Sequence, residues 1–201
     1  MENELVLNKP DEKKKSSANL LSVIPLEAEV INFLPVAADK LILDACCGSR
    51  SFWFDKNNRN TIYIDIRKEK NIQADKRGGR KAIDILPDIL TTFEKLPFKS
   101  ESFSLVVFDP PHGFFGESGY MAKYYGRLGS SWRTILKNGF AECFRVLKTN
   151  GILIFKWNEV YIPVKDILML ATYQPLFGNK SGKQHNTHWI CYMKTDRQKD
   201  L

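Results

Sequence analysis

The sequence lacks any apolar run long enough to cross a membrane. None of its hydrophobic segments approaches the roughly 20 residues that a transmembrane helix needs. The first residues, 1–4, are acidic and do not show the charged-then-apolar order of a signal peptide. These two absences predict a cytoplasmic protein with no membrane partner.

Cysteine is scarce and is not spaced for metal binding. The chain has 4 cysteines, of which Cys46 and Cys47 are adjacent while Cys143 and Cys191 stand alone in apolar segments. None forms a C-x-x-C pair, and two adjacent thiols are poorly placed to share one metal ion. We therefore predict small buried thiols and no metal site.

Two common nucleotide-binding motifs are also absent. The sequence contains no G-x-G-x-x-G and no G-x-x-x-x-G-K-[ST]. The first absence weakens the case for a nicotinamide-dependent enzyme, and the second weakens the case for a nucleotide triphosphatase.

The chain has the size of one domain. Its 201 residues, 43% of them hydrophobic, are enough for a single substantial core and too few for two domains of ordinary size. The polar segment 1–18 is expected to lack fixed structure. Residues 19–195 are expected to form the domain, and residues 196–201 a polar tail.

Basic residues exceed acidic ones. The sequence has 30 Lys and Arg against 23 Asp and Glu, a formal net charge of +7. Such an excess favours a polyanion such as DNA or RNA through contacts to phosphate. Part of it lies in segments 13–15 and 194–199, where it can equally serve as a solvated surface. A nucleic-acid partner and a merely soluble surface therefore stay open as alternatives, and no oligomeric state is predicted.

Short apolar runs alternate with helical patterns along the chain. Runs typical of buried strands cover 41–45, 61–65, 81–84, 105–108 and 152–155. Patterns typical of helices cover 25–34, 85–94, 132–147 and 163–171, with 132–147 the clearest. This alternation predicts an α/β fold, namely a Rossmann-like, mostly parallel sheet with helices on both faces.

The last stretch of the chain predicts a different connection. Residues 173–177 and 188–193 have the character of two strands joined by the polar loop 178–187. A hairpin at this place adds an antiparallel pair to a parallel sheet. In this respect the predicted sheet resembles that of methyltransferases more than that of dehydrogenases.

The most informative motif is Asp109-Pro110-Pro111-His112, which directly follows the apolar run 104–108. It closely resembles the Asp-Pro-Pro-Tyr motif of methyltransferases that act on the exocyclic nitrogen of adenine or cytosine, with His in place of Tyr. The resemblance implies that the Asp109 carboxylate and the Pro110 carbonyl accept hydrogen bonds from the amino group. The two prolines stiffen the loop, and His112 can stack on the base or exchange a proton. The alternative is that Pro-Pro-His is only a stiff loop and His112 does neither.

Segment 44–50 resembles motif I of class I S-adenosylmethionine-dependent methyltransferases. In both, an acidic residue, here Asp44, ends the first strand, and a turn of small residues follows. This turn contains Cys46 and one glycine, Gly48, which can adopt positive φ and lets a cofactor lie against the backbone. The resemblance implies S-adenosyl-L-methionine as the cofactor, with Asp44 near its methionine end. The structural alternative for Asp44 is a buried acid bonded to nearby amides.

Two further acids complete the expected cofactor site. Asp65 ends the second strand, and the resemblance implies that it binds the ribose hydroxyls. Asp84 follows the short third strand, and the resemblance implies contact with the adenine amino group. Capping of the next turn or helix is the alternative for both.

Aromatic residues after the motif are candidates for substrate contact. Phe114 and Phe115 can offer an apolar face to a base. Segment 113–131 is rich in glycine and aromatic residues. It forms either a lid, in which Tyr120 grips the substrate, or a small helix packed on the sheet.

Two more candidates follow the fifth strand. Trp157 and Asn158 stand at the carboxyl edge, where substrates bind in α/β sheets. Capping of the next helix is the alternative for Asn158.

The resemblance covers residues 25–195, almost the whole chain. It implies an S-adenosylmethionine-dependent N-methyltransferase of the compact phage or prophage type, acting on adenine in DNA or RNA. The alternatives are a small-molecule methyltransferase of the same fold and a non-catalytic nucleic-acid-binding module.

Overall fold

The computed structural model describes residues 33–73, 82–114, 116, 119–182, 184 and 186–196. All of them belong to one compact unit, residues 31–201. The predicted boundary between residues 18 and 19 lies outside the described residues, as does most of the helix expected over 25–34. Leu34, at the end of that segment, is extended and forms a single bridge with Phe98.

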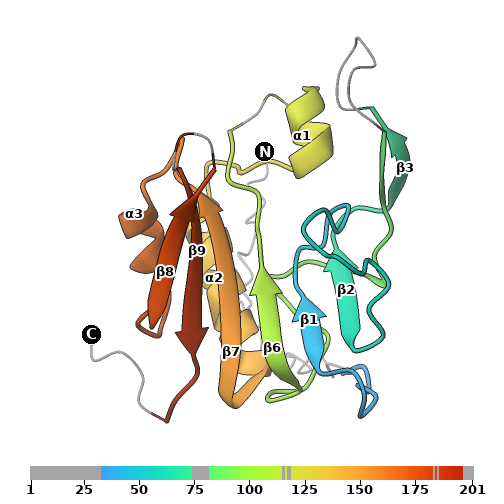
Figure 1. Cartoon of the computed structure of the whole chain (residues 1–201), viewed down its shortest axis with the longest axis vertical. Helices are drawn as coiled ribbons and strands as arrows, with labels where there is room; N and C mark the ends of the chain where they lie inside the picture. The colour runs from blue at the N-terminus through green and yellow to red at the C-terminus, as the bar shows by residue number, and fades with distance from the viewer. Residues whose placement is uncertain are drawn as a thin grey trace, which may run out of the picture. The chain divides into compact units, whose positions relative to one another are not determined.

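The fold is built on a seven-stranded sheet (Figure 1). Its strands lie in the order β5-β2-β1-β6-β7-β9-β8. Neighbours from β5 to β7 are parallel, whereas β9 is antiparallel to both β7 and β8. The bounds are β1 Ile42–Asp44, β2 Thr61–Asp65, β5 Ile89–Leu90, β6 Phe103–Phe108, β7 Leu147–Asn158, β8 Phe177–Ser181 and β9 Thr187–Met193. The predicted mostly parallel sheet with a C-terminal antiparallel hairpin is confirmed, but the first hairpin strand covers 177–181 and not the predicted 173–177.

The third predicted strand belongs to a different sheet. β4 (Ile83–Ile85) pairs antiparallel with β3 (Glu69–Ile72) in a separate two-stranded ribbon. The main sheet takes β5 at the position next to β2 instead. A short apolar run specifies a strand but not its partner, which explains the difference.

The prediction of a helix over 85–94 is wrong. The segment contains Pro87, which cannot donate to a helical ladder and disfavours helix at the residue before it. The Asp88 carboxylate accepts a hydrogen bond from the Tyr63 amide (2.9 Å), and the Asp88 amide donates to the Tyr63 carbonyl (2.8 Å). These bonds hold the segment against β2, and it continues as strand β5.

Helix α2 (Trp132–Val146) covers one face of the sheet and matches the prediction within a residue. Its apolar side packs on the strands through Phe140, whose ring lies 4.8 Å from that of Phe155 and 5.5 Å from that of Phe108. Gly139 allows this close approach, because a Cβ there would lie 2.7 Å from the Phe108 ring. Strand β7 begins directly after the helix, and Gly151 lies inside this strand.

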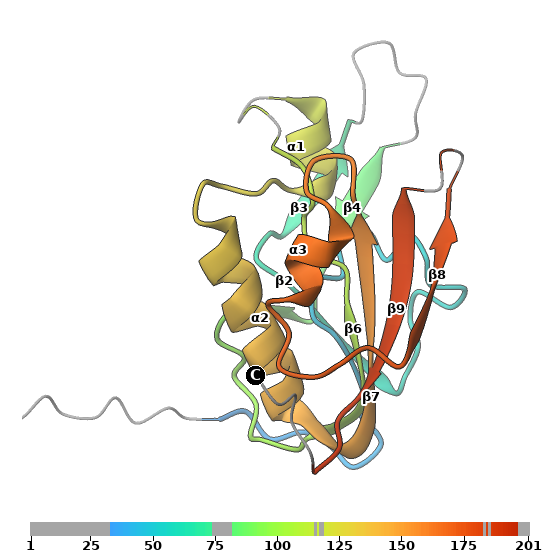
Figure 2. The ribbon, with the colours of Figure 1, turned by 90° about the vertical axis from the view of Figure 1, so that its left-hand side faces the viewer.

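Helix α3 (Val164–Leu168) is shorter than predicted and lies on the same face as α2 (Figure 2). On the opposite face, segment 45–60 forms turns between β1 and β2, so among the described residues the helices predicted for both faces cover one face only. Asp55 and Asn58 accept hydrogen bonds from the amides two residues later, which favours turns over a helix. Among the helices that the structure describes, none is long and apolar enough to cross a bilayer.

The central aromatic contact predicts a measurable loss of stability. Replacing Phe140 by Ala removes a fully buried ring and is expected to lower the free energy of unfolding by about 3–5 kcal/mol. Urea denaturation followed by circular dichroism measures the change. Lys137→Ala, an exposed site on the same helix, serves as the control and is expected to change it by less than about 0.5 kcal/mol. Equal effects of the two changes would contradict this account of the core.

Candidate functional site

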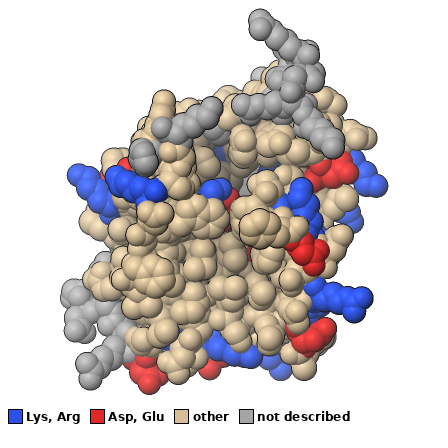
Figure 3. Space-filling model, in the orientation of Figure 1, with Lys and Arg blue, Asp and Glu red and all other residues tan. Residues whose placement is uncertain are grey.

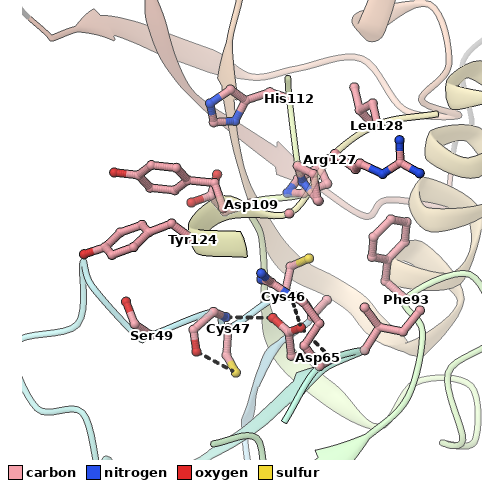
Figure 4. Close-up of a pocket in the computed structure, with 18 of the residues that line it drawn as sticks. Cys46, Cys47, Ser49, Asp65, Phe93, Asp109, His112, Tyr124, Arg127 and Leu128 are labelled. Atoms are coloured by element: carbon pink, nitrogen blue, oxygen red, sulfur yellow. Dashed lines mark hydrogen bonds and ion pairs between the residues drawn. The ribbon is translucent and has the colours of Figure 1, made fainter. Parts of the chain in front are cut away.

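A cavity of about 510 Å³ lies at the carboxyl ends of the parallel strands. The segments that follow β1, β2, β5 and β6 line it, together with helix α1 (Tyr120–Tyr125) and Lys156 of β7. In Figure 1, α1 lies beyond the arrowheads of these strands. Figure 4 shows Cys46, Cys47 and Asp65 on one side of the cavity and Asp109 and His112 on the other. This is the edge at which ligands bind in open α/β sheets.

The turn after β1 is held by a buried acid. Asp44 is fully buried, and its carboxylate accepts hydrogen bonds from Trp53 Nε1 (2.7 Å) and the Cys46 amide (3.2 Å). Burial raises the pKa of Asp44 to about 7, against the effect of these two bonds. The Asp109 and Asp65 carboxylates raise it further. Asp44 therefore stabilises the turn through these hydrogen bonds and does not itself line the cavity.

Asp65 fastens this turn to the second strand. Its Oδ2 accepts a hydrogen bond from the Gly48 amide (3.0 Å), and its Oδ1 accepts from the Arg67 amide (2.9 Å) and Arg67 Nε (3.2 Å). Gly48 has φ 49°, a backbone conformation that residues with a side chain rarely adopt. Asp65 and Gly48 both line the cavity.

The neighbouring thiols are not nucleophiles. Burial raises the pKa of the Cys46 thiol, and it raises that of Cys47 to about 12. The thiolate is the reactive form, so both side chains act as small apolar groups at neutral pH. The four cysteines are free, and three of them are buried, as predicted.

The Asp-Pro-Pro-His motif lines the opposite side of the cavity. The Asp109 carboxylate forms an ion pair with Lys156, with 2.6 Å between Oδ2 and Nζ. Lys156 is not among the residues predicted from the sequence. Period-two alternation along β7 is the signal that identifies it, because Trp157 in the core requires Lys156 to face the other side.

The surroundings of His112 disfavour its charged form. Burial lowers the pKa of its imidazole; the Asp109 carboxylate opposes this shift, and the Lys156 ammonium adds to it. The ring lies edge-on to that of Trp157, with 6.1 Å between centroids. Its Nδ1 is buried and has no hydrogen-bond partner among the described residues. The His112 ring therefore borders the cavity beside the motif carboxylate.

Helix α1 closes over the motif. Gly126 ends it with φ 75°, and a Cβ there would lie 2.8 Å from Pro111 Cγ. Arg67 Nη1 donates to the Lys123 carbonyl (2.9 Å), which ties the helix to Asp65. Segment 113–131 contains a small helix, as one of the two alternatives has it, but this helix lies beyond the strand ends and residues 122–128 line the cavity.

Several predicted contact residues lie away from the cavity. The Asp84 carboxylate accepts from the Asn71 amide within the β3–β4 ribbon. Trp157 is fully buried, and its Nε1 donates to the Ile162 carbonyl. Asn158 accepts from the Val160 amide and donates to Thr187. The structure therefore gives these three residues local structural contacts in place of the expected ligand contacts.

Two of the aromatic residues predicted to contact the substrate also lie outside the cavity lining. Phe114 is 43% exposed and lies edge-on to Tyr161, outside the cavity lining, and Tyr120 begins α1 without lining the cavity. Phe115 lies outside the described residues. Thr91, Thr92 and Phe93, which follow β5, line the cavity where Asp84 was expected. They were missed because the sequence predicts a helix there.

Comparison with known proteins identifies the fold. No protein-family model and no curated protein matches the sequence. A solved protein of Pyrococcus horikoshii is 17% identical, with 77% of this chain and 81% of that one covered and a TM-score of 0.51. The 1,6-didemethyltoxoflavin-N1-methyltransferase of Burkholderia thailandensis, solved with 1,6-didemethyltoxoflavin and S-adenosylhomocysteine, is 12% identical, with coverages of 78% and 71% and a TM-score of 0.50.

The chain has the class I methyltransferase fold. In this methyltransferase fold the cavity at the carboxyl edge joins the Gly48 turn to the Asp-Pro-Pro-His motif. These likenesses show the fold alone.

Burial of Asp44 predicts a pH-dependent stability. In the unfolded chain this carboxyl ionises near its ordinary pKa of 3.8, whereas in the folded protein it ionises near 7. Between these values the folded state binds one more proton, so its contribution to stability is lost as pH rises from about 4 to about 7. Asp44→Asn has no ionisable carboxyl at this position, so the variant does not lose this contribution to stability as the pH rises. The free energy of unfolding of the variant relative to wild type is expected to rise by on the order of 2–4 kcal/mol across that window.

Urea titrations at several pH values measure this difference. The slope with pH is the diagnostic quantity, because the amide also alters the bonds to Trp53 and Cys46. Asp166→Asn, on α3 away from the cavity, is the control and is expected to leave the slope unchanged. A slope for Asp44→Asn equal to that of wild type would contradict a buried, protonated Asp44.

Proposed function

We propose that this protein is an S-adenosylmethionine-dependent N-methyltransferase that acts on the exocyclic amino group of adenine in DNA or RNA. One observation carries the proposal. Asp109-Pro110-Pro111-His112, at the carboxyl end of β6, lines the same cavity as Gly48 and Asp65. A motif suited to holding a planar amino group thus faces a turn suited to holding a nucleoside cofactor.

The cavity fits the cofactor in size and in the groups it offers. Its volume of about 510 Å³ is in the range of small-molecule sites. The Gly48 turn presents backbone without a Cβ, and the Asp65 carboxylate has acceptor capacity beyond the three bonds it makes. Thr91, Thr92 and Phe93 supply hydroxyls and a ring for a base. The S-adenosylhomocysteine in the Burkholderia enzyme supports the choice.

When bound, S-adenosylmethionine supplies a methyl group on a positively charged sulfur. The chain's own residues then have to position and activate the amino nitrogen. Asp109 and the Pro110 carbonyl accept its hydrogen bonds, which favours a pyramidal nitrogen and stabilises the positive charge that develops there. The prolines keep this loop rigid, and α1 shields the cavity from water.

A small-molecule substrate is the second candidate. On the face shown in Figure 3, Lys and Arg side chains are scattered near the rim among acidic ones, around a broad uncharged area. A nucleic-acid interface normally gathers basic side chains into one patch. The covered cavity favours the same alternative, since helix α1 restricts access to it. The Burkholderia enzyme is named for a small-molecule substrate.

Mass spectrometry of nucleic acid tests the proposed reaction. Total DNA and RNA from cells expressing the wild-type chain are expected to contain N6-methyladenine above the level in cells expressing Asp109→Ala. Loss of the hydrogen-bond acceptor is expected to lower the methylation rate by about 100-fold or more. Retained binding of S-adenosylhomocysteine by the variant distinguishes lost chemistry from lost folding.

Two outcomes would redirect the proposal. Labelled methyl found only in small molecules favours the second candidate. Nucleic-acid binding that is equal in wild type and Asp109→Ala, with no methylation by either, would indicate a non-catalytic module.

Substitutions of two acids, Asp65 and Asp84, test cofactor binding separately from methyl transfer. Asp65→Ala removes a carboxylate in the cavity wall and is expected to weaken S-adenosylhomocysteine binding about tenfold or more, since hydrogen bonds to charged groups contribute about 1.5–3 kcal/mol. Asp84→Ala is the matched control, because Asp84 lies outside the cavity lining, and it is expected to leave the affinity unchanged. Calorimetry measures both. An unchanged affinity in Asp65→Ala would exclude the assignment of this wall to the cofactor.

A further inference from the structure

Lys156 forms an ion pair with one oxygen of the Asp109 carboxylate in the motif. Its Nζ lies 2.6 Å from Asp109 Oδ2, and the side chains are only 24% and 16% exposed. An ion pair so short and so far withdrawn from water is a strong charge-assisted hydrogen bond. The Asp-Pro-Pro-His motif therefore presents a paired carboxylate to the cavity and not a lone negative charge.

Two aromatic rings hold the lysine at this position. Nζ lies 5.6 Å from the ring centroid of Phe52 and 5.6 Å from that of Trp189. The two rings meet edge-on at 5.6 Å, so they form one aromatic wall beside the ammonium. Neither ring accepts a proton, and both stabilise a cation at this distance. Lys156 is thus fixed as a positive charge beside the group that would receive the substrate.

We propose that Lys156 is a specificity-determining residue that restricts the site to neutral, planar amino groups and excludes alkylammonium groups. The inference rests on the proposed function and names the chemical class of its substrate. A neutral aromatic amine donates a hydrogen bond to Asp109 without displacing the lysine. An alkylammonium group meets a like charge at the carboxylate, and such a juxtaposition is strongly unfavourable. Without Lys156, the same carboxylate would attract the cation.

The charge of the lysine, and not its bulk, is the property to vary. Lys156→Met keeps a long side chain and removes the charge, whereas Lys156→Arg keeps the charge. Lys156→Gln is a second neutral variant that retains hydrogen bonding, for use if the Met variant unfolds. Lys165→Met, on exposed α3 surface outside the cavity lining, matches the change in net charge and is the control.

The probes are two single-stranded thymidine oligonucleotides that differ at one central base. One carries adenine, and the other carries 6-(aminomethyl)purine, whose amino group is protonated at pH 7.5. Calorimetry in the presence of S-adenosylhomocysteine measures their dissociation constants. Wild type, Lys156→Arg and Lys165→Met are expected to prefer adenine by about tenfold or more, and the neutral variants are expected to lose or invert this preference.

The failures of the two proposals are distinguishable. A preference for adenine that survives unchanged in both neutral variants overturns the role of Lys156 and leaves the proposed reaction in place. A wild-type chain that distinguishes neither probe from an all-thymidine oligonucleotide, and methylates neither, overturns the inference together with the nucleic-acid substrate.

Discussion

The carboxylate of Asp65 joins the segments that form the cavity. It accepts hydrogen bonds from the Gly48 amide in the turn after β1 and from Arg67 after β2. Arg67 in turn donates to the Lys123 carbonyl, so the same carboxylate also anchors helix α1. The shape of the turn, the end of the second strand and the cover over the motif thus depend on one buried acid. A ligand that bonds to Asp65 would act on all three.

Three carboxylates lie at the ends of neighbouring strands, and their charges are compensated in two ways. Asp44 is buried and has a pKa raised to about 7, so protonation reduces its negative charge at neutral pH. Asp65 is paired with Arg67, and Asp109 with Lys156. Close like charges in a low-dielectric setting are costly, and this division allows the three acids to share one edge of the sheet. Of these three acids, the two paired ones line the cavity and Asp44 does not.

The sheet is asymmetric, and this arrangement positions the site. Helices α2 and α3 pack an aromatic core around Phe140 on one face, which turns Trp157 inward. Alternation along β7 then turns Lys156 toward the other face, where Phe52 and Trp189 hold it beside Asp109. The packing of the core thereby determines which side chains of β7 meet the motif.

The sequence alone determined the features that depend on local pattern. These are the apolar strands around Leu43 and Val106, helix α2, the hairpin order, and the placement of Asp109-Pro110-Pro111-His112 directly after a strand. Strand periodicity and turn residues act over a few positions, so they can be recognised without a partner. Only the tertiary structure decided which strand lies beside β2, and with it the choice of Thr91–Phe93 over Asp84. It also decided that Trp157 is core, that Lys156 pairs with Asp109 and that Arg67 reaches α1. These outcomes depend on contacts between segments far apart in the chain, and no local pattern encodes such contacts.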